Sequence, residues 1–213
     1  MMKTVHMAVY DTFSDWEVGH ATAHINRALW HRDPGTWQVK TVAIGAEPIT
    51  SMGGMRILPD LVLEDLKPGD SAMLILPGLE TELDPETPAA FARKAREFVT
   101  AGVPVAAICG GTFALAQEGL LDDRPHTSNA AEYLAYSGYA GGEHFVQAPA
   151  VTGGDVITAS GTSPVEFARE ILARLDIFEP HVLEAWYKLY GNNDPAGFCT
   201  LYEYEQQQQA AAR

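Results

Sequence analysis

The stretch Val-Pro-Val-Ala-Ala-Ile-Cys-Gly-Gly-Thr-Phe-Ala-Leu-Ala, residues 103–116, decides the fold of this 213-residue chain. Its apolar first part, Val103–Ile108, predicts a strand that is buried on both faces, and helix-forming residues follow the two glycines. A single nucleophilic residue, Cys109, stands between the strand and the helix. With Ala107 two residues before it and Gly111 two after it, the order matches a nucleophile elbow. We therefore predict that Cys109 lies at a tight turn at the carboxyl end of a strand.

Apolar segments and helical patterns alternate on both sides of this stretch. We expect further strands at Val5–Tyr10, Trp37–Ile44, Ala72–Leu76, Phe145–Val151 and Val156–Ala159. We expect helices at Asp15–Arg32, Thr87–Ala101, Thr112–Glu118, Ala130–Tyr136, Pro164–Leu175 and Pro180–Tyr190. Apolar strands that alternate with helices are typical of a doubly wound α/β fold with a covered parallel sheet. In such folds the active site lies beyond the carboxyl ends of the strands.

The composition is typical of one globular domain and excludes several classes of function. The 28 acidic and 14 basic residues give a net charge of −14, which repels nucleic acids and anionic membranes. Two cysteines are too few for a disulfide framework, and we expect neither a signal peptide nor a membrane span, because no stretch has the apolar core that either requires. We expect a cytoplasmic protein with a single domain over residues 1–200. Residues 201–213, which include four glutamines and three alanines, are expected to be a frayed tail.

The position of Cys109 predicts its chemistry. The start of the helix after an elbow stabilises negative charge, so we expect the pKa of the thiol to be lowered. The N–H of Gly110 is expected to face an oxyanion that forms above the sulfur. The alternative is a buried cysteine that only fills space, as most free cysteines do. Its place between an apolar strand and a double glycine favours the functional interpretation.

Several segments resemble a known family. Leu74–Gly78, Ala107–Gly111 and Gly119–Asn129 look like segments of the DJ-one/PfpI superfamily, whose members are relatives of class I glutamine amidotransferase domains. The segment Asp11–Glu17 fits the first strand and helix of the same family. The resemblance extends from residue 5 to about residue 175. It implies a flavodoxin-like sandwich, a homodimer, and a reactive cysteine in a shallow pocket near the subunit interface.

The resemblance also implies roles for residues around the cysteine. Glu17 occupies the place of an acidic residue that contacts the sulfur, and a carboxyl group beside a thiolate has a raised pKa. The N–H groups of Gly78 and Leu79 are expected to complete an oxyanion site with that of Gly110. Leu79 departs from the family pattern, because many relatives have a second glycine there.

The family histidine is not found at its usual places. Gly110 follows the cysteine, and the Thr-Ser run after the elbow helix ends in Asn129 instead of histidine. His126 is a candidate base, but in a strand its side chain faces away from that of position 129, so a packing role is the alternative. Asn129 is expected to hydrogen-bond the thiolate or to orient a substrate carbonyl. Together with Thr112 and His20, it is expected to line the pocket.

These residues predict a cysteine-dependent enzyme that acts on a small electrophile, with Glu17 as the proton carrier. Hydrolysis of small amides, hydration of isonitriles and hydration of methylglyoxal all fit. The non-enzymatic alternative is a redox or stress sensor that uses reversible oxidation of Cys109. A glutamine amidotransferase is less expected, because no His-x-Glu pair follows the cysteine. His20 and His24 share a helix face but lack the His-Glu-x-x-His pattern, so we expect neither a metal nor another cofactor.

Overall fold

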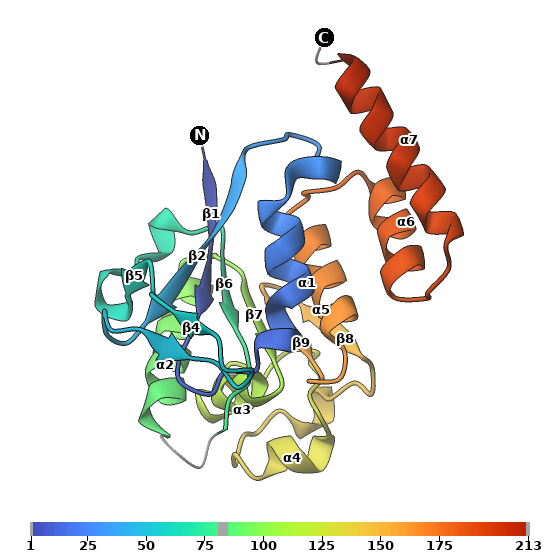
Figure 1. Cartoon of the computed structure of the whole chain (residues 1–213). Helices are drawn as coiled ribbons and strands as arrows, with labels where there is room; N and C mark the ends of the chain where they lie inside the picture. The colour runs from blue at the N-terminus through green and yellow to red at the C-terminus, as the bar shows by residue number, and fades with distance from the viewer. Residues whose placement is uncertain (1, 81–84, 212–213) are drawn as a thin grey trace.

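The computed structural model describes residues 2–80 and 85–211, and a seven-stranded sheet forms its centre (Figure 1). The strands are β1 (Lys3–Ala8), β2 (Trp37–Ala43), β5 (Leu61–Val62), β6 (Met73–Leu76), β7 (Val105–Ile108), β8 (Ala150–Gly153) and β9 (Val156–Ala159). Their order is β5-β2-β1-β6-β7-β9-β8, and β8 alone runs antiparallel to its neighbour within this sheet. The order β2-β1-β6-β7-β9 is that of flavodoxin, which confirms the predicted α/β fold.

The central strands are apolar because both faces of the sheet are covered. Every residue of β6 and β7 is buried, and Leu74 of β6 pairs with Val105 of β7. On the other side of β6, Met73 pairs with Val5 of β1. A separate antiparallel hairpin, β3 (Ile49–Thr50) and β4 (Arg56–Ile57), lies outside the main sheet.

Helices cover the two faces of the sheet in pairs. They are α1 (Asp15–Asn26), α2 (Glu86–Thr100), α3 (Gly110–Gln117), α4 (Ala131–Ala135), α5 (Pro164–Arg174), α6 (Pro180–Tyr190) and α7 (Ala196–Ala211). Short 3-10 helices span Ala28–Trp30, Leu63–Asp65, Pro68–Asp70 and Gly142–His144. Helix α1 packs against α5 and α2 against α3, and the two pairs lie on opposite faces of the sheet (Figure 1).

The structure corrects some predicted boundaries. The first helix ends at Asn26, because Arg27 has extended backbone angles, and a 3-10 turn follows it. The strand expected at Phe145–Val151 is displaced to β8, where the backbone pairs with β9. No helix within residues 2–80 and 85–211 is long and apolar enough to cross a bilayer.

The C-terminal segment is a helix, which corrects the expected frayed tail for residues 201–211. Helix α7 packs on α6 and touches the 3-10 turn after α1. The Leu201 side chain is fully buried, and Gln208 Nε2 donates a hydrogen bond to the His31 carbonyl at 2.6 Å. Glutamine and alanine are good helix formers, so a run of them continues a helix whose first half is anchored.

Candidate active site

Four segments meet at the carboxyl edge of the sheet, each following a parallel strand, and the first of them includes the first turn of α1. They bring together Glu17 after β1, Gly78 after β6, Cys109 after β7 and Gly161 after β9. This is the edge at which doubly wound α/β proteins bind their ligands. The structure therefore brings these residues together at the edge of the sheet where the sequence predicts the site.

The backbone at Cys109 has the conformation of a nucleophile elbow. Its φ of 55° and ψ of −122° are uncommon for a residue with a side chain, and the surrounding structure must hold such strain. The Cys109 N–H donates to the Ala159 carbonyl at 3.1 Å. The Cys109 carbonyl accepts hydrogen bonds from Thr112 N–H at 3.1 Å and Thr112 Oγ1 at 2.6 Å. The strained turn is thus fixed on both sides of the cysteine.

Thr112 was expected to line the pocket, but its side chain supports the turn instead. Its side chain is fully buried, and its hydroxyl proton is donated to the Cys109 carbonyl. Its oxygen therefore accepts from the Ser128 hydroxyl, at 2.6 Å. Ser128 belongs to the segment after the elbow helix, so this pair ties that segment to the turn.

Two glycines let the sulfur of Cys109 lie close to the neighbouring loops. A Cβ at Gly78 would lie 3.1 Å from Cys109 Sγ, and a Cβ at Gly161 would lie 2.9 Å from it. The same Cβ at Gly161 would lie 3.1 Å from Glu17 Oε1. The sulfur and this carboxyl oxygen therefore border one small space, which a larger residue at position 161 would fill.

The second carboxyl oxygen of Glu17, Oε2, fixes the side chain beside the sulfur. Only 1% of the residue is exposed, and Oε2 accepts a hydrogen bond from the Gly78 N–H at 2.6 Å. Oε1 is buried and has no hydrogen-bond partner of ordinary geometry among the described residues. Burial raises the pKa of the carboxyl group to about 7, although Gly78 N–H and the side chains of Cys109 and Ser14 oppose the shift. The raised pKa predicted for Glu17 is confirmed, with burial as its main cause.

The thiol of Cys109 has a raised pKa, so the prediction of a lowered one is wrong. Burial, followed by the negative charge of Glu17, raises the pKa to about 11. Asn129 Nδ2, which donates to Sγ at 3.3 Å, and the Gly110 N–H act in the opposite direction and are outweighed. Asn129 is fixed in turn, because its Oδ1 accepts from the Gly161 N–H at 2.9 Å. The two acids Cys109 and Glu17 therefore carry at least one shared proton at neutral pH.

The backbone N–H groups near Cys109 have different partners. The Gly78 N–H is used to bind Glu17, so it does not take the expected place in an oxyanion site. Within residues 2–80 and 85–211, the Leu79 N–H has no acceptor. Leu79 N lies 3.4 Å from the position of a Cβ at Gly110, and the Gly110 N–H interacts with the sulfur. Of these three amides, that of Leu79 is the one without an acceptor in the described part of the chain, and that of Gly110 faces the sulfur.

Comparison with known proteins identifies the family of this chain. The profile of the DJ-1/PfpI family matches residues 3–174. The chain belongs to the DJ-1/PfpI family. A thiJ/pfpI family protein from Bacillus anthracis is 38% identical, with a TM-score of 0.89 over 96% of this chain and 98% of that one.

Two other proteins are also similar over nearly the whole chain. A DJ-1 superfamily protein from Agrobacterium tumefaciens is 32% identical, with a TM-score of 0.79 over 90% of this chain and all of that one. YoaZ of Bacillus subtilis, described as an uncharacterized protease, is 38% identical over 93% of this chain and 96% of its own length. The family profile ends before α6 and α7, whereas the match to the Bacillus anthracis protein covers 96% of the chain and therefore includes at least part of both helices.

His126 has a structural role in this DJ-1/PfpI family protein. It is fully buried, its Nδ1 is paired with the Arg124 carbonyl at 2.8 Å, and its Nε2 is paired with the Tyr139 hydroxyl at 3.0 Å. Both ring nitrogens are therefore occupied, and burial lowers the pKa of the ring. The structure favours the packing alternative over a catalytic base.

His20 was expected to line the pocket, but it packs against helix α6 instead. Its ring packs against Trp186 and Tyr190 of α6, with ring centroids 6.1 Å and 5.5 Å away, and it does not line the pocket beside the cysteine. Its neighbour His24 belongs to the same aromatic cluster. In the described part of the chain, no group of three or more His, Cys, Asp or Glu side chains could hold a metal ion.

Two site residues were missed in the sequence. Gly161 follows a predicted strand at the active edge, and that position is the signal that identifies it. Tyr133 has a pKa raised to about 12, by burial first and then by the charges of Cys109 and Glu17, so its hydroxyl lies within electrostatic reach of the pair. It is part of the short helix α4, and no sequence signal connects that helix with the elbow.

Proposed function

We propose that this protein is a cysteine-dependent hydrolase of small acyl compounds such as amides. Cys109 is the nucleophile, and Glu17 carries the proton. The observation that carries this proposal is the buried, unpartnered Oε1 of Glu17, which borders the same small space as Cys109 Sγ. A group with a pKa of about 7 both accepts and donates a proton readily at neutral pH. The description of YoaZ as a protease also supports hydrolysis.

The first half of the reaction forms a thioester. The sulfur attacks the acyl carbon while the Glu17 carboxylate takes the thiol proton, so that a thiolate with a high pKa does not accumulate beforehand. The new S–C bond moves the carbonyl π pair onto oxygen, where the N–H groups of Leu79 and Gly110 stabilise it. This pair then re-forms the C=O bond. The C–N bond breaks, and its electron pair leaves with the amine, which takes the proton from Glu17.

The second half consumes one water molecule. The water oxygen attacks the thioester carbon while Glu17 takes a proton from the water. The tetrahedral intermediate then collapses, the C–S bond breaks, and its electron pair returns to sulfur, which recovers the proton. The carboxylic acid leaves. Asn129 Nδ2 stabilises the sulfur in both halves, because it donates to Sγ.

The high pKa of the thiol argues against a redox sensor as the main role. Oxidation by peroxide proceeds through the thiolate, and a thiol whose pKa is raised to about 11 has little thiolate at neutral pH. Attack on an acyl substrate does not require a thiolate that forms beforehand, because Glu17 takes the thiol proton as the sulfur attacks. Hydration of an isonitrile or of methylglyoxal would use the same two residues. The test therefore compares these two substrates with small amides.

The test compares Cys109→Ala with the matched variant Cys199→Ala. Cys199 is exposed on α7, outside the site. We expect the wild type and Cys199→Ala to release amine from small amides at equal rates, and Cys109→Ala to lose at least about 1,000-fold in rate. Methylglyoxal and an isonitrile are tested in parallel. Turnover that survives in Cys109→Ala contradicts the proposal, as does clean sulfinate formation at low peroxide without turnover of any substrate.

A further inference from the structure

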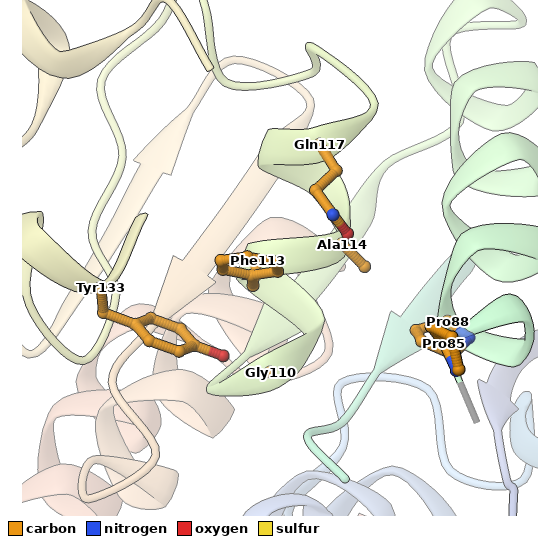
Figure 2. A pocket seen from close by; sticks show the side chains of 7 residues that line it. All are labelled: Pro85, Pro88, Gly110, Phe113, Ala114, Gln117 and Tyr133. Carbon is orange, nitrogen blue, oxygen red and sulfur yellow. The ribbon is translucent and has the colours of Figure 1, made fainter. Parts of the chain in front are cut away.

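A cavity of about 150 Å³ lies beside the elbow helix. Its lining residues come from α2, α3 and α4 and from the turn before α2: Pro85, Pro88, Gly110, Phe113, Ala114, Gln117 and Tyr133. Figure 2 shows α3 between Tyr133 on one side and the two prolines on the other. The cavity is therefore bounded by separate elements whose relative positions the core determines.

The cavity extends to the residue next to the reacting cysteine. Gly110, which lines it, is the residue directly after Cys109, and its N–H interacts with Sγ. The Tyr133 hydroxyl is directed toward the Gly110 end of α3 (Figure 2). Burial, followed by the charges of Cys109 and Glu17, raises the pKa of Tyr133 to about 12. A group attached to the carbon that Cys109 attacks would therefore enter the cavity past Gly110.

The walls are suited to a hydrocarbon group. Two proline rings, the Phe113 ring and the Ala114 methyl group are apolar, and the Phe113 and Tyr133 rings lie 5.2 Å apart at 44°. Among the lining residues that the structure describes, none carries a charged side chain. A charged group would lose its hydration there without a described partner of opposite charge, whereas an apolar group gains by leaving water.

The volume limits the size of the group. An apolar protein cavity of roughly 150 Å³ accommodates benzene. A single methyl group would leave most of this space empty, and a fused two-ring system would exceed it. We propose that this cavity is the subsite for a phenyl-sized apolar group, aromatic or branched aliphatic, on the acyl compound that Cys109 attacks. The inference rests on the proposed function, because it assigns a substrate class to that site.

The test uses covalent modification of Cys109, which does not require turnover. In a Cys199→Ser background, alkylation is followed with 2-chloroacetamide and with N-benzyl-2-chloroacetamide, and each rate is divided by that of glutathione. We expect the benzyl reagent to be favoured by about 10-fold or more, because its ring is buried in the cavity. Benzyl alcohol should reduce this preference with saturation, since it competes for the same space.

Two matched substitutions locate the effect. Ala114→Leu fills the cavity from its buried wall and should abolish the preference, whereas Ala131→Leu on the exposed side of α4 should keep it. Thermal unfolding shows whether Ala114→Leu is folded, and the benzyl alcohol experiment needs no variant. Equal normalised rates in the wild-type site overturn the subsite and leave the proposed function intact. Failure of Cys109 to react with either reagent overturns the proposed function instead.

Discussion

Helix α1 carries two buried titratable side chains, and they differ in what surrounds them. Glu17 lies in the first turn, where one oxygen accepts the Gly78 N–H and the other borders Cys109 Sγ. His24 lies two turns later, where its ring contacts Trp186 and Tyr190 at centroid distances of 5.3 Å and 5.1 Å. Its Nδ1 has no hydrogen-bond partner among the described residues.

The same physical cause acts on both groups. Burial disfavours the charged form, so it raises the pKa of Glu17 to about 7 and lowers the pKa of His24 to about 4. A strongly shifted pKa is therefore not enough to identify a catalytic group in this protein. Glu17 differs because a nucleophile lies within reach of its unpartnered oxygen, whereas aromatic rings surround His24.

The largest expected difference between the two residues is in catalytic rate. Glu17→Gln keeps an oxygen for the Gly78 N–H but cannot carry a proton, so we expect kcat/KM for a small amide to fall by about 100-fold to 10,000-fold. His24→Phe keeps an aromatic ring in the cluster and should change kcat/KM by less than about two-fold. Steady-state kinetics at pH 7.5 measures both. Equal losses in the two variants would contradict the distinction drawn between them.

A smaller effect is expected in the pH dependence of stability for Glu17. Its pKa rises from 4.5 to about 7 on folding, so the folded state binds the extra proton between these values. The unfolding free energy should therefore fall by about 1–3 kcal/mol as the pH increases from 4.5 to 7. Urea denaturation should show this loss in the wild type and not in Glu17→Gln. An identical pH dependence in the two proteins would show that Glu17 is not buried as described.

His24 should act in the opposite direction and over a lower pH range. Its pKa falls from 6.5 to about 4 on folding, so the unfolded state binds the extra proton between these values. Its contribution to stability is therefore present above pH 6.5 and is lost as the pH falls to about 4, by about 1–2 kcal/mol. His24→Phe should weaken this acid sensitivity in urea denaturation between pH 7 and pH 4. If acid destabilises both proteins equally, other groups dominate that range.

The sequence predicted much of the fold because its central strands are short, apolar and buried on both faces. The elbow at Cys109 could be located for the same reason, since a buried strand, one nucleophile and two glycines occur together there. The helix after residue 200 was missed, because a tail of glutamine and alanine has no apolar pattern of its own. Its position depends on Leu201 and on the hydrogen bond from Gln208 to His31, which are tertiary contacts.

The details of the site were less predictable, because they depend on loops from different strands. The Gly78 N–H was expected to bind an oxyanion, but the loop presents it to Glu17. The thiol pKa was predicted from the helix start alone, whereas burial and Glu17 outweigh that effect. Gly161 approaches the sulfur from a segment that is distant in sequence, and the pKa of Tyr133 responds to burial and to the charges of Cys109 and Glu17 from another, so local patterns do not reveal them.

The pH dependence of Cys109 alkylation tests the pairing of Cys109 with Glu17 most directly. In a Cys199→Ser background, iodoacetamide should react with the wild-type site at a rate that rises through an inflection near pH 7, where Glu17 loses its proton. In Glu17→Gln this inflection should disappear, leaving the rise that belongs to the thiol itself. The same inflection in both proteins would show that Glu17 does not control the proton on Cys109.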